Sequence, residues 1–543
     1  MKALRVVFQL GLMAGSLLFF IISPALFQVE SSTLSLEYAD LIFYNANVIT
    51  ISDQTPQAQA IAIKGDKILA VGTNTDILQQ YKNPDTTIIT LEGQTIMPGL
   101  IDGHTHLMWS ALYTDIQTLV SAQQIALSYG YTTLNEKGAD IWERDIQPLL
   151  DAEQADELLL RINIFPVYNL AFLDNESNPI IVERWYPERD PILDHDRMLR
   201  VPGIKIYADG ASGGGRGWPA LSVNYSQEAI EEWGLANPRG DLYFNQTELN
   251  SIVKIIHDKG FSCAFHSMGD RSTDTVLNAI EYALDGETND NYRHQIEHNS
   301  FIRQDQIAKA LQLNTLHSMR GYFPTIWQDD YASLFNETLL EWFVNRYSLP
   351  SSGVHSYYES DFTWEIYIEG DSRSTRNINP FLHLWGLVTR SYMDENGTIY
   401  RPNPWLAEHG ITVEQALKVM TLEGAYAVKQ EEYIGSLEDG KFADLIVLSD
   451  NPLTINPDEL KDLEVLVTMV GGKIEFMREG FTFPDTTDTS TSSSTQSSTQ
   501  ITIPTPGWTF VTFLLAIIVI VGKRRQFSKF LSFSSNVLKN KTN

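Results

Sequence analysis

Cysteine is almost absent from this chain of 543 residues, in which Cys263 is the single example. One cysteine excludes a disulfide framework and a zinc site built from several cysteines. Basic residues are also scarce, because 39 lysines and arginines stand against 68 acidic residues, giving a net charge of −29. This surplus of negative charge argues against nucleic acid as a partner. The chain is still long and apolar enough, with 43% hydrophobic residues, to bury one large core and a smaller one.

Acidic residues are missing from both ends of the chain. Residues 1–27 contain Lys2 and Arg5 followed by an apolar run, which is typical of a secretory signal peptide. An N-terminal anchor that is not cleaved is the alternative. Either interpretation predicts that the rest of the chain is exported.

The C-terminal region has three parts of different composition. Residues 481–505 form a linker rich in Ser and Thr, residues 506–522 are uncharged and mostly apolar, and residues 523–543 hold six basic residues and no acidic one. At about 1.5 Å per residue, residues 506–522 are just long enough to cross a membrane. A buried core helix is the alternative. Because basic flanks favour the cytoplasmic side, the sequence predicts a C-terminal transmembrane helix, a cytoplasmic tail and a body displayed outside the cell membrane.

Two β-rich blocks enclose the middle of the chain. Residues 28–97 contain strand-like stretches at 39–50 and 58–71, and residues 434–480 contain stretches of the same kind. The simplest arrangement is a small composite β-sandwich built from both blocks, with residues 98–433 inserted between them.

The inserted segment alternates strand-like with helix-like stretches, which favours an α/β architecture. Eight candidate strands are residues 95–104, 131–136, 158–168, 203–209, 261–266, 294–298, 315–319 and 364–371. Eight such units predict a (β/α)8 barrel of TIM type, whose active site lies at the C-terminal ends of the strands. Residues 170–200 and 320–363 fit the pattern less well, and we expect them to lie over the barrel mouth.

The first of these strands ends in a pair of histidines. Residues 95–106 read TIMPGLIDGHTH, so His104 and His106 are two positions apart. Side chains at that spacing on a strand point to the same face, where two imidazoles could hold one metal ion. Two histidines that serve only packing or a turn are the alternative.

Five motifs together resemble the amidohydrolase superfamily, and most closely amidohydrolase family 3, which includes enzymes similar to N-substituted formamide deformylases. They are PGLIDGHTH at residues 98–106, GIKIYADG at 203–210, HSMGDR at 266–271, RHQIEH at 293–298 and IGSLEDGKFADL at 434–445. The resemblance extends over residues 39–476. It implies a hydrolase of small molecules that uses one or two divalent ions, zinc being expected, to attack a non-peptide C–N bond of amide or N-formyl type.

The resemblance also implies a set of metal ligands, which are His104, His106, Lys205, His266, His298 and Asp371. His266 and His298 end predicted strands, and neutral imidazoles are common zinc ligands. Lys205 lies in an apolar strand, where an ammonium could not bind a cation. The family solves this by N6-carboxylation of the lysine, which creates an anionic carbamate that bridges two metals. A lysine paired with Asp209 or Glu297 is the alternative.

Asp371 is expected to bind metal and to accept the proton of the attacking water. The family usually carries Gly-Ser-Asp-x-Pro at this place, whereas residues 369–376 here read EGDSRSTR, so Asp361 and Glu365 are the alternatives. Arg320 is a candidate for contact with substrate. His317 is a second such candidate, and a loop or packing role is the alternative for both. Glu136 could face the metals or the substrate. Four residues beside the ligands could orient them, although plain structural roles fit them equally well: Asp270, Arg271, His294 and Glu297.

Two other kinds of function stay open. A deaminase or a cyclic-amide hydrolase of the same superfamily would use the same ligands. A catalytically inactive surface protein, serving as a binding module or scaffold, would fit the linker and anchor equally well. It would have no need, however, for six polar residues converging at one barrel mouth. The substrate itself is not predicted, because specificity resides in loops, where the match to the family is weakest.

Overall fold

The computed structural model describes residues 37–112, 116–139, 141–174, 176–182, 186–211, 217–363, 378–394 and 396–483. All of these described residues belong to one compact unit. The predicted signal peptide or anchor, the transmembrane helix and the basic tail therefore lie outside the described residues. Within the described part of the chain, no helix is both long and apolar enough to cross a membrane.

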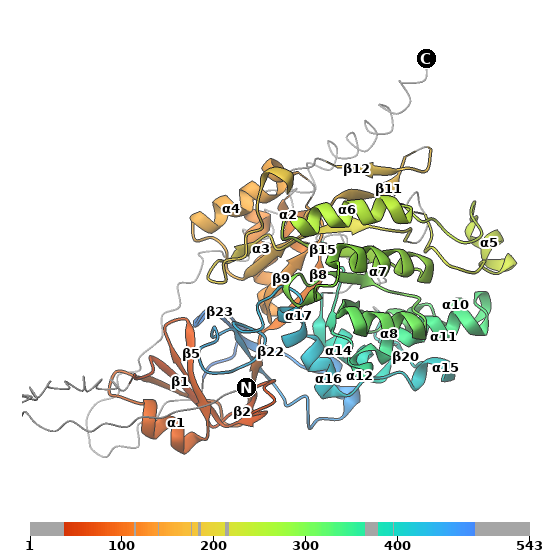
Figure 1. Cartoon of the computed structure of the whole chain (residues 1–543). Helices are drawn as coiled ribbons and strands as arrows, with labels where there is room; N and C mark the ends of the chain where they lie inside the picture. The colour runs from red at the N-terminus through yellow and green to blue at the C-terminus, as the bar shows by residue number, and fades with distance from the viewer. Residues whose placement is uncertain are drawn as a thin grey trace, which may run out of the picture. The chain divides into compact units, whose positions relative to one another are not determined.

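Parallel strands form a barrel with helices on its outside (Figure 1). Eight strands of the described residues make the ring: β8 (Leu100–Thr105), β9 (Tyr131–Glu136), β10 (Arg161–Ile164), β14 (Gly203–Tyr207), β15 (Ser262–Ser267), β16 (Gln295–His298), β17 (Leu316–Met319) and β18 (Ser356–Tyr358). They pair as two sheets, β13-β10-β9-β8 and β14-β15-β16-β17-β18, where β13 is Leu199–Arg200. The sheets join through a parallel bridge from Val167 to Lys205 and another from His106 to Thr363. The structure thus has the predicted TIM-type α/β architecture.

The closing strand differs from the sequence prediction. We expected it at residues 364–371, which lie outside the described residues, but the strand that pairs with β17 is β18. After β18, the amide of Asp361 donates to the carbonyl of His104 at 2.8 Å, and this contact closes the ring onto β8. The pattern was misread because only three residues have strand geometry here and acidic residues follow them at once, which interrupts the apolar texture of a strand.

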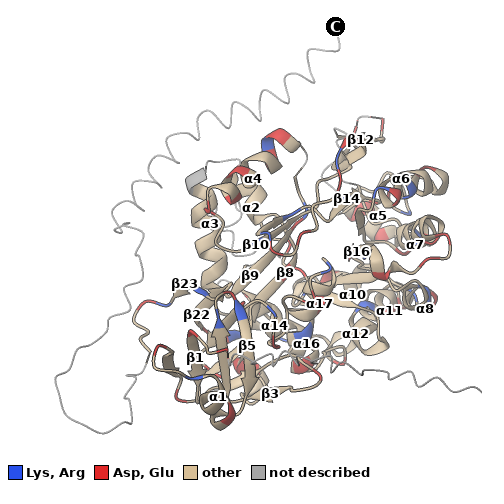
Figure 2. Ribbon diagram, turned by 60° about the vertical axis from the view of Figure 1, so that its left-hand side comes forward, with Lys and Arg blue, Asp and Glu red and all other residues tan. Residues whose placement is uncertain are grey.

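Helices α6 (Gln246–Asp258), α7 (Asp270–Leu284) and α8 (Gln304–Leu313) lie next to one another on the outer face of the barrel (Figure 1). Asn245 and Glu248 form a capping box that starts α6. The buried residues of α6 include Leu249, Val253 and Ile256, whose spacing places them on one face against the strands. Other helices in this outer layer are α2 (Leu107–Leu112), α3 (Ile116–Ser128), α4 (Gln147–Gln154), α14 (Pro380–Thr389), α16 (Val413–Val419) and α17 (Leu422–Tyr426). Charged residues, coloured blue and red in Figure 2, lie mainly on these helices and on the connecting segments.

Irregular segments carry shorter elements. They are β11 (Asn169–Leu173), β12 (Pro179–Ile181), α5 (Gln227–Trp233), α9 (Phe323–Ile326), α10 (Gln328–Leu334), α11 (Glu337–Asn345), α12 (Leu349–Ser352), β19 (Tyr392–Met393), β20 (Ile399–Tyr400) and α15 (Pro404–Ala407). A cluster of buried apolar residues joins two of these segments. Leu221 and Tyr225 come from the segment that contains α5, and Leu334 and Phe343 come from α10 and α11. Two segments far apart in the sequence therefore form one structure.

A second core lies between two further sheets. One has the order β5-β4-β1-β6 and the other β23-β22-β21-β7-β2-β3. Their strands are β1 (Leu41–Tyr44), β2 (Asn47–Ile49), β3 (Gln57–Ala58), β4 (Ala60–Lys64), β5 (Lys67–Gly72), β6 (Thr87–Thr90), β7 (Thr95–Pro98), β21 (Leu445–Leu448), β22 (Val465–Val470) and β23 (Lys473–Met477), with helix α1 (Asn74–Tyr81) beside them. Phe43 and Ile61 of the first sheet pack with Ile96 and Val447 of the second. Strand β7 pairs with β21, so one sheet contains both ends of the described chain.

Gly99 divides the first predicted strand into two. Residues 95–98 form β7 of the β-rich part, whereas residues 100–105 form β8 of the barrel. A Cβ on Gly99 would lie 2.2 Å from the side chain of Thr132, so the close approach of the chain to β9 requires glycine. A single continuous strand over 95–104 was therefore wrong.

Candidate metal centre and cavity

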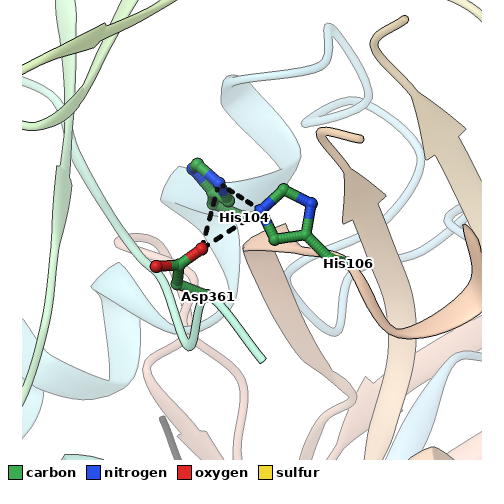
Figure 3. A group of neighbouring side chains, drawn as sticks. All are labelled: His104, His106 and Asp361. Atoms are coloured by element: carbon green, nitrogen blue, oxygen red, sulfur yellow. Dashed lines mark hydrogen bonds and ion pairs between the residues drawn. The ribbon is translucent and has the colours of Figure 1, made fainter. Parts of the chain in front are cut away.

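The end of β8 and the segment after β18 bring together His104, His106 and Asp361. In Figure 3 the two imidazole rings and the carboxylate point toward one another. Asp361 Oδ1 lies 3.1 Å from His106 Nε2 and 3.6 Å from His104 Nε2. The two Nε2 atoms are 3.3 Å apart. Two imidazoles and one carboxylate oxygen at these distances could hold a divalent metal ion.

A second group of potential ligands is adjacent. The ring centroid of His298, at the end of β16, lies 4.7 Å from that of His104 and 4.8 Å from that of His266. His298 Nδ1 lies 3.0 Å from Glu359, which follows β18 directly. The four histidines named by the sequence prediction therefore form one continuous cluster at the C-terminal ends of β8, β15 and β16.

Lys205 is fully buried in β14, and its Nζ has no hydrogen-bond partner among the described residues. Burial lowers the pKa of this ammonium to about 8, although the charges of Glu297 and Asp361 oppose the change. The charge of Lys205 in turn helps to lower the pKa of His104. A lysine amine without a partner, next to imidazoles, is an unusual feature of a protein interior.

Glu297 orients the first histidine. Its Oε2 lies 2.8 Å from His104 Nδ1, which donates to it, so the Nε2 of His104 faces His106 and Asp361. Lys137 Nζ lies 3.4 Å from the other oxygen of Glu297. Burial lowers the pKa of His104 well below its usual value, so the imidazole is neutral. A neutral imidazole whose second nitrogen donates to a carboxylate is the usual arrangement of a histidine that binds a metal.

Arg320, at the end of β17, holds the two carboxylates that follow β18. Its guanidinium is paired with Asp361, and its Nε lies 3.1 Å from Glu359. Glu359 also accepts a hydrogen bond of 2.6 Å from Ser318 Oγ. Burial raises the pKa of Glu359, but His298 and Arg320 outweigh that effect and lower it to about 2. The residues fit a metal centre, because burial lowers the pKa of His104 and His266 and keeps their imidazoles neutral, while Glu359 is held as an anion.

The predicted ligand Asp371 lies outside the described residues. Asp361, which the sequence offered as an alternative, is the aspartate that lies beside His104 and His106. The signal for Asp361 was present, because Ser360-Asp361 preserves the Ser-Asp of the family pattern Gly-Ser-Asp-x-Pro. Asp102 supports this segment: its carboxylate accepts hydrogen bonds from the amide of Ser360, at 3.1 Å, and from the Ser360 hydroxyl. Glu359 carried no recognisable signal, since its neighbours read as a loop.

The remaining predicted residues take supporting positions. Glu136 accepts hydrogen bonds from the amides of Met108, at 2.7 Å, and Trp109, at 3.3 Å, and so holds the first turn of α2 directly after His106. Burial raises the pKa of Glu136 to about 7. Arg271 donates to the carbonyl of Gly240 at 3.0 Å.

Three other candidates lie in hydrogen-bond networks outside the ligand cluster. Asp270 accepts from Arg303 at 2.6 Å. The rings of His294 and His257 are hydrogen-bonded at 3.1 Å. His317 is hydrogen-bonded to Asn299 and Thr315. The described lining of the cavity includes none of Asp270, Arg271, His294 and His317.

A cavity of about 700 Å³ opens onto the ligand cluster. The four clustered histidines and Asp361 line it at one end. Aromatic side chains from α5, α9 and α10 and from the segments beside them form much of its wall, including Trp218, Trp233, Phe323, Trp327 and Tyr331. The cavity can therefore take a small molecule with an apolar body and present one of its bonds to the cluster.

Comparisons with known proteins agree with this geometry. A sequence model described as "Amidohydrolase family" matches residues 114–332 and 368–476. The chain is 23% identical over 574 residues to an N-substituted formamide deformylase of Arthrobacter pascens, covering 81% of this chain and 99% of that protein.

Two solved structures share the fold. One is an uncharacterized metal-dependent hydrolase from Pyrococcus furiosus, with a TM-score of 0.59 and 18% identity, covering 76% of this chain and 100% of that one. The other is molinate hydrolase, with a TM-score of 0.55 and 15% identity, covering 81% of this chain and 95% of that one.

Proposed function

The chain belongs to the amidohydrolase family and is therefore a metal-dependent hydrolase of carbon–nitrogen bonds, and we propose that its substrate is a non-peptide amide, specifically an N-substituted formamide. The convergence of His104, His106 and Asp361 carries the proposal. The likeness to a formamide deformylase over almost the whole of that protein supports the N-formyl class.

Six residues would hold one or two divalent ions, expected to be zinc: His104, His106, Lys205, His266, His298 and Asp361. Such ions polarise the substrate carbonyl and lower the pKa of a water from about 15.7 toward about 7. Asp361 accepts the proton of the attacking water and returns it to the leaving amine. Arg320 pairs with Asp361 and so fixes the direction of its carboxylate. The aromatic wall excludes water from the reacting bond and holds the substituent on nitrogen.

Carboxylation would adapt Lys205 to this role. The Lys205 ammonium first loses one proton, and the neutral amine then adds to CO₂ and releases a second proton. The cation thereby becomes an anionic carbamate, which could bind a divalent ion. The complete burial of Nζ and its lack of a hydrogen-bond partner among the described residues support this step. Lys205→Ala should then lose one metal ion and most activity, and added acetate should restore part of both. Undiminished metal content in that variant would remove Lys205 from the ligand set.

The direct test uses the full-length protein, stripped of metal with a chelator and reloaded with Zn²⁺. We expect release of formate from N-substituted formamides only after reloading, with His106→Ala as the inactive control. Release of ammonia from an amino-substituted heterocycle, with no formate from the formamides, would indicate a deaminase instead. A folded protein that binds no divalent ion would support the inactive binding or scaffold protein.

The place of the enzyme is a second part of the proposal. The apolar run over residues 506–522, the basic residues after it and the N-terminal pattern of residues 1–27 support display outside the cell membrane. Protease added to intact cells should then digest the barrel, while an epitope placed after Lys539 should stay protected. Protection of the barrel would overturn this placement.

A further inference from the structure

Arg346 is a buried cation in the cavity wall that has no carboxylate partner within the described part of the chain. Its side chain follows α11, lines the cavity, and belongs to a residue that is only 2% exposed. Nη2 donates to the Tyr347 hydroxyl at 2.6 Å, and Nη1 makes long contacts of 3.5 Å with the carbonyl of His298 and the hydroxyl of Ser300. Nε has no partner, and no ion pair joins Arg346 to any acid of the described residues. An uncompensated charge of this kind is costly to bury.

Two other arginines, Arg320 and Arg390, differ from Arg346 in their partners or in their position relative to the cavity. Arg320 also lines the cavity, but Glu359 and Asp361 neutralise it. Arg390 is fully buried, yet it donates to the carbonyls of His409 and Gly321 and does not line the described cavity. Among these three arginines, only Arg346 lines the cavity and has no counter-ion among the residues that the structure describes.

The surroundings of Arg346 fit an anion that arrives with the substrate. The guanidinium lies 4.4 Å from the ring centroid of Phe343 and 4.8 Å from that of Tyr347, which offsets part of the cost of its burial when the cavity holds no anion. Its contact with the backbone of His298 places it close to the ligand cluster. A planar guanidinium forms strong, directional hydrogen bonds with a carboxylate.

We propose that Arg346 binds a carboxylate of the substrate, so that the enzyme selects amides carrying both an apolar or aromatic body and a negative charge. The assignment rests on the proposed function, because it places that carboxylate in the cavity whose ligand cluster cleaves the amide. It makes Arg346 a determinant of specificity, whereas the metal ligands and Asp361 perform the chemistry.

Two pairs of probes isolate the charge. The first pair is N-formylphenylalanine and N-formyl-2-phenylethylamine, which is the same molecule without its carboxylate, compared by kcat/KM in the zinc-loaded full-length enzyme. The second pair is 3-phenylpropionate and 3-phenylpropan-1-ol, compared by the quenching of tryptophan fluorescence, since Trp218 and Trp327 line the cavity. The second pair reports binding without turnover.

The variants are Arg346→Gln, Arg346→Lys and, as a matched control, Arg390→Gln. In Arg346→Gln we expect the preference for the anionic member of each pair to fall roughly 10- to 100-fold, the size of a charge-assisted hydrogen bond, with little change for the neutral member. Arg346→Lys should keep part of the preference, and it decides the matter if the glutamine variant does not fold. Arg390→Gln should leave both preferences intact.

An unchanged preference in both Arg346 variants would overturn the assignment, because the carboxylate would then be held by the metal or elsewhere. Equal use of both formamides by the wild-type enzyme would also overturn it while leaving the proposed function standing. If the wild type cleaves neither formamide but binds phenylpropionate through Arg346, the anion site holds and the N-formyl class is wrong.

Discussion

Two aspartates are candidates for one role at the mouth of the barrel. Asp361 lies against His106 and Arg320, whereas Asp371 stands ten residues further along the chain. We predict that Asp361→Asn retains its metal but lowers kcat by roughly 10²- to 10⁴-fold, because an amide cannot accept the proton of the attacking water.

Asp371→Asn is the matched control for this prediction and should change kcat little. Metal content and turnover are measured for both variants beside the wild type. A large loss in the Asp371 variant, with normal turnover in the other, would return the base role to Asp371.

At the level of single residues, the sequence predicted those that end recognisable strands. His104, His106, His266 and His298 belong to motifs with apolar neighbours, so their shared end of the barrel could be inferred. Glu359 could not, because its role depends on contacts with His298 and Arg320, which come from other strands. Acids that are stabilised by distant partners leave no local pattern.

Strand β8 runs so close to the closing strand that Gly103 cannot carry a side chain. A Cβ there would lie 2.2 Å from the aromatic ring of Tyr357 and 2.7 Å from the backbone oxygen of Tyr358. That backbone oxygen belongs to β18, so it cannot move away without opening the barrel. We predict that Gly103→Ala destabilises the fold by about 1–3 kcal/mol or more and disturbs His104.

Urea unfolding and metal content test this. Gly72→Ala is the control, since its Cβ would meet Ile77 at an ordinary 3.6 Å. Equal unfolding midpoints for the two variants would contradict the tight contact between β8 and β18.

Helix α2 starts on a carboxyl group whose ionisation depends on folding. Burial raises the pKa of Glu136 from 4.5 to about 7, so the folded chain keeps a proton that the unfolded chain has lost between these values. The folded state therefore loses stability as pH rises from about 4.5 to about 7, because the buried Glu136 must then ionise. The loss from this group is about 1.4 kcal/mol for each unit by which its pKa is shifted.

Glu136→Gln has no charge to bury. The variant keeps one acceptor oxygen, which can take the hydrogen bond from the Met108 amide, whereas its NH₂ group cannot accept the one from Trp109. We predict that its stability relative to the wild type improves between pH 5 and pH 8, as measured by urea midpoints. The same difference between the two proteins at both pH values would show that Glu136 ionises alike in both states.

The eighth strand of the barrel is the element whose position the sequence pattern did not predict. Residues 364–371 read WEIYIEGD and alternate as a strand should, whereas β18 has three residues with strand geometry and acids directly after them. The polar residues that interrupt the pattern are those that face the metal centre. Local rules are most often broken at functional sites, where distant partners compensate for the cost.

At the scale of the whole molecule, the β-rich part depends on both ends of the described chain. Strands β21, β22 and β23 make up half of the six-stranded sheet, and β21 pairs directly with β7. A fragment of residues 37–483 should fold, whereas one ending at Gln430 should aggregate, because Phe43 and Ile96 lose their cover.

Solubility and cooperative unfolding of the two fragments check this prediction. They differ only in the last 53 residues, so the comparison isolates those strands. A soluble and cooperative shorter fragment would mean that the barrel does not need the completed sheet.

The strands of this six-stranded sheet are synthesised at widely separated times. Strands β1 to β7 leave the ribosome first, but β21 begins only at Leu445, some 350 residues after β7 ends. At roughly 5–20 residues per second, that interval lasts about 20 to 70 seconds, during which one edge of β7 has no neighbour. The last barrel strand, β18, is made before β21, so the barrel can close while this edge of β7 is still unpaired. Strands β21 to β23, which are made last, therefore complete the sheet. Until they are made, the open edge of β7 must be kept from pairing with other strands.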